Sequence, residues 1–366
     1  MPTDTMTTRR RWLAALHNQP IDRLPFWPKI FGAYASVQQP PFNQLSTREL
    51  HEWIGSDQHE SMADSTREVR TNTSREQVRD GNLLRTVFRT PHGEAIMLEQ
   101  WDAASQSWHP IKHPLASKAH LRLMTEFYAD ESWEFDAMKH AQAQAWQQEV
   151  GESALVATCI GESPLMHFVE SLAGIENAHY LLHDCPAEVE ALFAAMHASL
   201  LRKTEINAAH STADAFYFME NTSTTLISPA QYRAYCLPYL RAYAEVMQAA
   251  GKLVILHMCG HLKQLLPDIA TLPVAAYEAF TSPTLGNTTL RDGRAACPDV
   301  CLIGGTNAIL WTRPHEEIIV QLEHDLAELP HHRGLVITSA GVMPPLATPE
   351  TIKGVCEWVK GYAVVM

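Results

Sequence analysis

Residues 253–267 read LVILHMCGHLKQLLP, and this stretch shows the unit from which the chain is built. An uninterrupted apolar run over 253–256 is typical of a buried parallel strand. The run ends in His257, Met258 and Cys259, and a helical pattern follows at once. A buried strand that leads directly into a helix is the βα unit of a parallel sheet.

The same alternation recurs from residue 154 to the end of the chain. We expect strands over 154–160, 214–220, 252–259, 274–280, 300–306 and 334–340. Residues 26–30 and a weaker segment at 54–59 would bring the total to eight strands. Eight strands fit the α/β class, as a (β/α)8 TIM barrel. A doubly wound open sheet is the alternative, but no Gly-rich dinucleotide-binding loop follows any of these strands.

The chain is expected to form one domain over residues 1–366. Residues 151–366 carry the regular β/α repeats, including one long helix over 228–251 that Ser228 can cap. Residues 1–150 are irregular, and we expect this N-terminal part to cover the barrel mouth. It carries a β-hairpin over 84–99, which turns at Pro-His-Gly.

Composition narrows the class of function. The 366 residues include 28 Lys and Arg against 41 Asp and Glu, for a net charge of −13. An acidic surface disfavours binding to nucleic acid or to an anionic membrane. The seven cysteines form no disulfide framework, and the N-terminus has no secretory signal. We therefore expect a cytoplasmic enzyme.

Polar side chains gather where the predicted strands end, and in a barrel the C-terminal strand ends carry the chemistry. His257 and Cys259 lie two residues apart, so both can point into the barrel. Imidazole and thiolate are preferred zinc ligands. Two alternatives stay open at this point, a thiol–imidazole nucleophile pair and a pair of ordinary core residues.

Two carboxylates, Glu220 and Glu278, also end strands. A buried carboxylate needs a partner, because unpaired burial is costly. The structural interpretation is a salt bridge to an arginine such as Arg89 or Arg294. The functional interpretation is a metal ligand or a proton donor.

The stretches TTRRRWLAALHNQPIDRLPFWP (7–28), LVILHMCGHLKQLLPDI (253–269), LIGGTNA (302–308) and ITSAGVMPPLATPETIKGV (337–355) carry a resemblance. Together they resemble the uroporphyrinogen decarboxylase superfamily, and within it the cobalamin-dependent methyltransferase branch. That branch includes methylcobamide:coenzyme M methyltransferases and the methyltransferase components of O-demethylases. The resemblance implies a (β/α)8 barrel. The Arg-rich signature of true uroporphyrinogen decarboxylases is absent after Pro25, which argues against tetrapyrrole decarboxylation.

The resemblance also implies a zinc site. The branch binds Zn²⁺ through His-x-Cys and a later Cys in a Gly-Cys-x-x-Pro-Pro segment. His257 and Cys259 match the first two ligands, but Gly341 stands in place of the third. Glu278 matches a strand-end Glu that can reach the metal, so we expect His257, Cys259 and Glu278 as ligands. Glu220 is the expected catalytic residue.

The reaction implied is methyl transfer between a small donor or acceptor and a corrinoid. No Asp-x-His-x-x-Gly corrinoid-binding motif is present, so the cobalamin is expected on a separate corrinoid protein. We expect Trp27, Asn221 and Asn307 to bind the substrate, which is either a methoxylated aromatic or a thiol. The alternatives are a metal-free decarboxylase and a non-catalytic homologue that docks a corrinoid protein. The oligomeric state, with a homodimer as one option, is left open.

Overall fold

The structure is a computed structural model that describes residues 4–31, 33–103 and 106–366. Its centre is an eight-stranded sheet in which every pair of neighbouring strands is parallel. In spatial order the strands are β1 (Phe26–Trp27), β14 (Leu335–Thr338), β13 (Cys301–Gly305), β12 (Ala276–Phe280), β11 (Leu253–His257), β10 (Ala215–Met219), β9 (Ala154–Gly161) and β2 (Gln58–Ser61). The expected (β/α)8 barrel is confirmed.

Asp57 joins the two edge strands of this sheet. The Asp57 N–H donates to the Phe26 carbonyl at 2.7 Å, and the Phe26 N–H donates to Asp57 Oδ2 at 2.9 Å. The fully buried Asp57 carboxylate also pairs with Arg11 at 2.6 Å and with Arg23 at 2.7 Å. A buried carboxylate is tolerated when charged donors satisfy it, so these arginines hold the seam where β1 meets β2.

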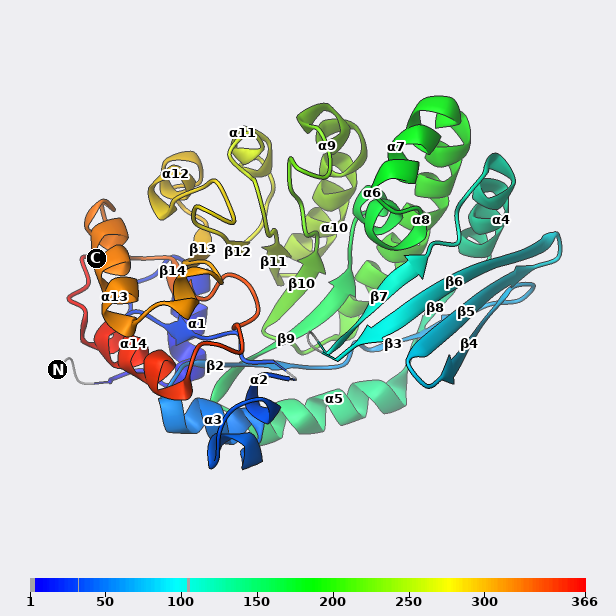
Figure 1. Cartoon of the computed structure of the whole chain (residues 1–366). Helices are drawn as coiled ribbons and strands as arrows, with labels where there is room; N and C mark the ends of the chain where they lie inside the picture. Colours follow the sequence, from blue (N-terminus) through cyan, green and yellow to red (C-terminus); the bar gives the residue numbers. More distant parts are fainter. Residues whose placement is uncertain (1–3, 32, 104–105) are drawn as a thin grey trace.

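Helices surround the barrel (Figure 1). They are α6 (Pro164–His167), α7 (Ile175–Asp184), α8 (Pro186–His210), α9 (Pro229–Tyr235), α10 (Leu237–Ala249), α11 (Leu266–Ile269), α12 (Leu290–Ala296), α13 (His315–Ala327) and α14 (Pro349–Gly361), with a π-helical turn η2 (Phe168–Leu172) and 3₁₀ turns η1 (Phe42–Gln44) and η3 (Leu310–Thr312). The single helix expected over 228–251 is wrong. It is two helices, α9 and α10, because Pro238 has no N–H to continue the helical hydrogen bonds.

The barrel interior is filled mostly by small and branched side chains. Alternate strand residues such as Leu155, Ala215, Ile255 and Ala276 form one buried cluster there. Three residues of α1 (Thr8–Leu16), namely Trp12, Ala15 and Leu16, belong to the same cluster. The first helix therefore closes one end of the barrel interior.

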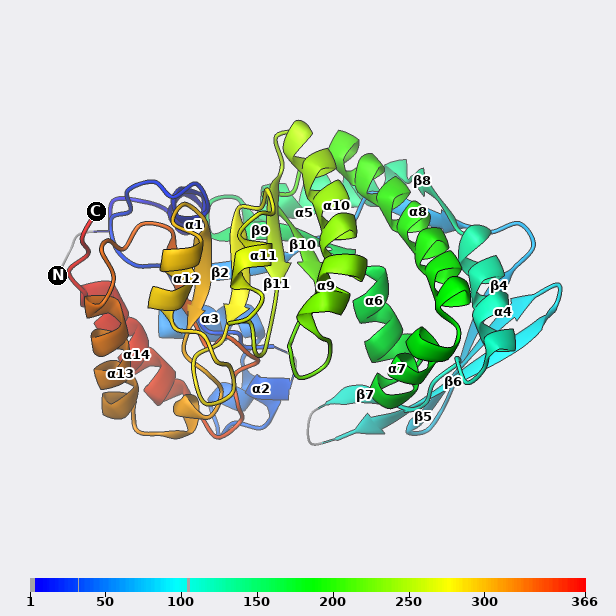
Figure 2. The same ribbon diagram turned by 90° about the horizontal axis from the view of Figure 1, so that it is seen from above.

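The remaining elements of residues 1–150 lie beside the barrel. They are α2 (Ala33–Ser36), α3 (Thr47–Ile54), β3 (Thr66–Val69), β4 (Ser74–Asp80), β5 (Leu83–Thr90), β6 (Gly93–Asp102), β7 (Ser107–Lys112), α4 (Lys118–Ala129), β8 (Ser132–Phe135) and α5 (Ala137–Val150). The expected hairpin is β5–β6, at the centre of a four-stranded antiparallel sheet. In Figures 1 and 2 this sheet lies beyond α4 and α8, opposite α13 and α14.

No helix in the described part of the chain is long and apolar enough to cross a membrane.

Candidate functional site

His257 and Glu278 meet at the ends of two neighbouring strands. They are direct partners in the register of β11 and β12. Two residues earlier on each strand, Ile255 and Ala276 belong to the cluster that fills the barrel interior. Because side chains alternate along a strand, His257 and Glu278 face the interior as well. Both are buried, with 7% and 1% of their surface exposed.

Lys29 completes a buried ionic group around Glu278. Its Nζ lies 2.8 Å from Glu278 Oε1, while Glu278 Oε2 contacts His257 Nδ1. Lys29 follows β1, and its backbone is fixed by hydrogen bonds to Ser339 Oγ and from the Met343 N–H. The predicted salt bridge of Glu278 to an arginine is therefore wrong in its partner. Arg89 pairs with Glu76 and Glu94, and Arg294 donates to backbone carbonyls.

The charges of Lys29, Glu278 and His257 affect the pKa values of the carboxylate and the imidazole. Burial alone would raise the pKa of Glu278, but Lys29 and His257 hold that pKa well below its usual range. Burial alone would lower the pKa of His257, and the Glu278 carboxylate reverses this effect and raises the pKa to about 9. At neutral pH the group therefore contains an ionised carboxylate between two cations.

The backbone turns sharply beside this group. Ala279 has φ of +59°, and the register between β12 and β13 shifts between Glu278 and Phe280. Ala340 and Asn221, which follow the ends of β14 and β10, also have positive φ. Residues other than glycine seldom adopt this conformation, and such strain concentrates at functional sites.

The Cys259 thiol also interacts with His257 and helps to raise the pKa of that histidine, and it takes part in a second set of contacts. Its Sγ donates to Asn221 Oδ1 at 3.2 Å, and Asn221 Nδ2 donates to Glu170 Oε2 at 3.0 Å. Glu170 lies in the π-helical turn η2. Burial, with the nearby Glu162 carboxylate, raises the pKa of Glu170 to about 7. Asn221, expected to bind substrate, thus connects the thiol to a carboxyl group that sequence reasoning missed.

The fit of this site to zinc can be tested on its donor atoms. The carboxylate on His257 Nδ1 leaves Nε2 as the coordinating nitrogen, and a carboxylate in this position is the usual orienting partner of a metal-bound histidine. Each oxygen of Glu278 has one contact, with Lys29 or with His257, so its contacts match that orienting role, and its role as a zinc ligand stays a prediction. Among the described residues no three His, Cys, Asp or Glu side chains gather as a ligand set. His257 and Cys259 therefore offer two donor atoms of the kinds that zinc prefers, one fewer than the three protein ligands of a usual catalytic zinc site.

A cavity of about 240 Å³ opens inside the barrel next to Glu278. Its walls are mainly aromatic and small side chains from β1, β2, β9 and β10. The lining residues are Trp27, Lys29, Phe31, His59, Ser61, Ala157, Cys159, Tyr217, Met219 and Glu278. Trp27, predicted to bind substrate, is part of this wall.

Glu220 and Asn307 lie elsewhere. Tyr217 and Met219 line the cavity, so Glu220 comes next on the opposite side of the strand. There it accepts a hydrogen bond from the Ser163 N–H, and burial raises its pKa to about 8. Asn307 donates to Ser282 Oγ and the Pro283 carbonyl. Among the described contacts, neither residue is joined to Glu278 or His257.

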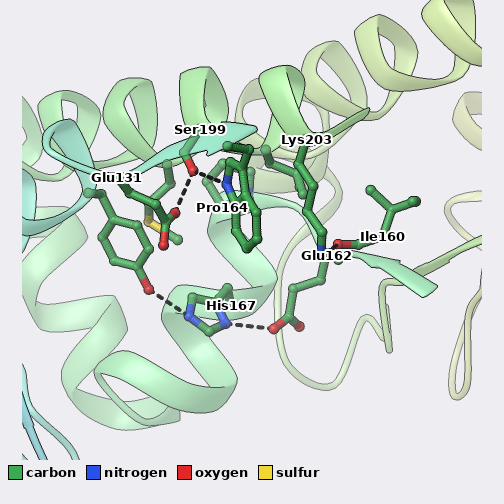
Figure 3. A pocket seen from close by; sticks show the side chains of 12 residues that line it. Glu131, Ile160, Glu162, Pro164, His167, Ser199 and Lys203 are labelled. Atoms are coloured by element: carbon green, nitrogen blue, oxygen red, sulfur yellow. Dashed lines mark hydrogen bonds and ion pairs between the residues drawn. The ribbon is translucent and has the colours of Figure 1, made fainter. Parts of the chain in front are cut away.

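A second pocket, of about 190 Å³, lies between the end of β9 and helix α8 (Figure 3). His167 is one of the lining residues, and it contacts Tyr128 Oη at 2.9 Å and Glu162 Oε1 at 2.6 Å. Ser199 donates to Glu131 and accepts from the Trp133 ring nitrogen. The polar groups of this pocket thus bond largely to one another, as the dashed lines in Figure 3 show.

Comparison with known proteins decides the family. The model of the uroporphyrinogen decarboxylase (URO-D) family matches residues 130–362, more than half of the chain. The chain belongs to the uroporphyrinogen decarboxylase family. The family expected from the sequence is therefore confirmed.

A solved structure supports the fold of this family member. A methyltransferase from Methanosarcina mazei aligns over 97% of this chain and 99% of its own, with a TM-score of 0.59 and 14% identity. A putative vitamin-B12-independent methionine synthase from Listeria monocytogenes aligns over 62% of this chain and 70% of its own, with a TM-score of 0.40 and 10% identity. No curated protein matches the chain. At these identities the first structure supports the barrel fold.

Several residues of this candidate site, among them Lys29, His59 and Glu170, were not predicted from the sequence. Lys29 directly follows the strand–Pro28 unit, so a survey of strand ends that included β1 would have found it. His59 sits within the weakest predicted strand. Glu170 lies in a π-helical turn after β9, and the hydrophobic periodicity of the sequence does not predict that turn.

Proposed function

We propose that this protein is a methyltransferase that moves a methyl group between a small substrate in the barrel cavity and a separate corrinoid protein, with zinc held by His257 and Cys259. One observation carries the proposal. An imidazole oriented by a carboxylate stands two residues from a thiol, at a strand end next to the cavity. This combination of groups suits zinc. The fold shared with a methyltransferase from Methanosarcina mazei supports it.

The chain's own residues have distinct tasks in this proposal. Bound zinc would supply Lewis-acid polarisation of the substrate heteroatom that carries or receives the methyl group. Glu278 holds His257 in one tautomer through Nδ1, and Lys29 keeps Glu278 ionised. The aromatic wall of the cavity excludes water and packs against the substrate. The corrinoid protein would approach from the barrel mouth, where Cys259 is partly exposed.

In this proposal Glu220 does not act on the substrate as an acid inside the cavity. It lies behind the strand, so an effect on catalysis would pass through the Ser163 backbone and the end of β9. Its assignment as a catalytic residue stays a prediction. Glu220→Gln, which preserves the shape and the neutral form of the side chain, tests it.

A metal-free decarboxylase is the second candidate, and one observation favours it. His257 holds a proton at neutral pH, so it is a proton donor beside the cavity. Glu278 does not fit the donor role expected of it in this alternative, because Lys29 and His257 keep it ionised. A decarboxylase would therefore use His257.

Methyl transfer to cob(I)alamin tests the proposal. The protein would be purified in reducing buffer without chelator, loaded with zinc, and mixed with methoxylated aromatics and methyl thioethers. We expect the cob(I)alamin spectrum to change to that of methylcobalamin, and Cys259→Ala to abolish the change. Cys185→Ala, at the junction of α7 and α8, is the matched control and should keep it.

The rival outcomes are distinct. Turnover by a zinc-free protein that releases CO₂ from a carboxylic acid would replace the proposal with decarboxylation. A protein that binds a corrinoid protein but methylates no cobalamin would be a non-catalytic homologue. Equal methyl transfer by Cys259→Ala and wild type would overturn the zinc assignment.

A further inference from the structure

Two buried polar atoms in the wall of the barrel cavity have no hydrogen-bond partner among the described residues. They are Nε2 of His59 and Oη of Tyr217. Both side chains line the cavity. A buried polar atom without a partner costs free energy, so native structures keep few of them, and those they keep need an explanation.

The positions of these side chains are fixed from several directions. His59 lies on β2 and Tyr217 on β10, on either side of β9. The His59 ring stacks on Trp27, with centroids 4.6 Å apart, and meets the Tyr217 ring edge to face at 5.3 Å. Ala157 of β9 also lines the cavity, and its small side chain leaves room there. The two unpaired atoms are thus held in place by ring packing alone.

In the second pocket, between β9 and α8, the polar side chains satisfy one another's hydrogen bonds. In Figure 3, His167 uses both ring nitrogens, one toward Tyr128 and one toward Glu162. His59 and Tyr217 contact each other through their rings and leave both polar atoms unused. This difference indicates that the barrel cavity is built to receive a ligand.

The chemistry of the lining narrows the ligand. Among the lining side chains Lys29 and Glu278 carry opposite charges, and the others carry none because burial lowers the pKa of His59 to about 4. A neutral imidazole and a phenol can each donate or accept one hydrogen bond. A ligand hydroxyl that both donates and accepts would satisfy the two atoms together. A cavity of about 240 Å³ with aromatic walls suits a single ring.

We propose that His59 Nε2 and Tyr217 Oη form a subsite for the hydroxyl group of a small, neutral aromatic ligand. That this ligand is the methyl donor rests on the proposed function. The subsite itself needs neither zinc nor a corrinoid.

The test compares two probes of similar shape, phenol and toluene, by calorimetric titration of the purified full chain. Wild type should bind phenol at least about tenfold more tightly than toluene, since toluene leaves both atoms unpaired. Tyr217→Phe removes one partner and should bring the two affinities close together, mainly by weakening phenol. His59→Phe should do the same.

Tyr232→Phe is the matched control. The Tyr232 hydroxyl is also buried and has no partner in the part of the chain that the structure describes, but Tyr232 lies on α9 and is not among the residues that line the barrel cavity. It should therefore leave the phenol preference unchanged. Tyr217→Phe should also unfold at the same or a higher temperature than wild type, because it deletes an unpaired buried hydroxyl, and this shows that any loss of binding is not a loss of fold.

Two results would overturn the subsite. One is equal affinity of wild type for the two probes, including no measurable binding of phenol. The other is a phenol preference that survives in Tyr217→Phe. A phenol preference without methyl transfer would uphold the subsite and reject the proposed function. Methyl transfer without a phenol preference would uphold the proposed function and reject the subsite.

Discussion

Lys29 and Glu278, 249 residues apart in the chain, form an ion pair of 2.8 Å inside the barrel mouth. Lys29 follows β1, and Glu278 lies on β12, which is separated from β1 in the sheet by β14 and β13. The pair ties distant strands of the barrel together across the cavity. It also keeps the carboxylate beside His257 ionised.

Lys29→Met should destabilise the protein. The change leaves the buried Glu278 carboxylate with one partner in place of two, and breaking a buried pair costs about 3 kcal/mol. Urea unfolding followed by circular dichroism measures the loss. The double variant Lys29→Met/Glu278→Gln should lose less than the single variant, because it removes the unpaired charge. A double variant less stable than Lys29→Met would contradict this account.

Stability should fall as pH rises from about 6.5 to about 9. The folded-state pKa of His257 is raised to about 9, above the ~6.5 of an unfolded histidine. Below pH ~6.5 both states hold the proton and the contribution is fully present. As pH rises the unfolded state loses its proton first, so the contribution disappears as the pH passes through the folded pKa.

Urea unfolding of chelator-treated protein across this pH range makes the measurement. His257→Gln should flatten the profile, while His183→Gln, at an exposed position, should leave it as in wild type. Identical slopes for wild type and His257→Gln would show that Glu278 does not raise the pKa of this histidine.

Strand alternation made much of the fold predictable from sequence. The six strands after residue 154 each contain a compact apolar run, and they occur within a few residues of their predicted bounds. Pro238 illustrates the limit. The amphipathic pattern continues across it, so periodicity predicts one helix where the missing N–H produces two.

The site was predictable only in part, for a similar reason. His257 and Glu278 stand out because they end apolar strands, and register brings them together. Lys29 and Tyr217 gain their roles from tertiary contacts. Lys29 follows a two-residue strand, and Tyr217 reads as an ordinary core aromatic until its unpaired hydroxyl is seen beside a cavity.

Ala279→Gly should leave stability unchanged or raise it by up to about 1 kcal/mol. Alanine at φ +59° carries a steric cost that glycine avoids, and this offsets the greater entropy of unfolded glycine. Ala276→Gly, earlier on the same strand, is the control and should lose about 1 kcal/mol. Thermal unfolding compares the two. Equal losses would mean that the turn after Glu278 stores no strain.

Gly341→Cys should increase zinc affinity. The resemblance to the methyltransferase branch puts Gly341 in the place of a third ligand, and a Cβ built there meets no atom within 4 Å. A third protein ligand should tighten a site that otherwise has two. Competition with a chromogenic chelator measures the affinity. Gly361→Cys, with equally open space at the end of α14, controls for an added thiol. An equal increase in zinc affinity in both variants would show that the added thiol acts away from the site of His257 and Cys259.

Zinc content tests the central claim most directly, namely that His257 and Cys259 hold the metal of a methyltransferase. The measurement is zinc per chain after purification in reducing, chelator-free buffer, for wild type, His257→Ala, Cys259→Ala and the control Cys185→Ala. We predict stoichiometric zinc in wild type and Cys185→Ala, and its loss in the other two. A zinc-free wild type, or full zinc in Cys259→Ala, would contradict the account.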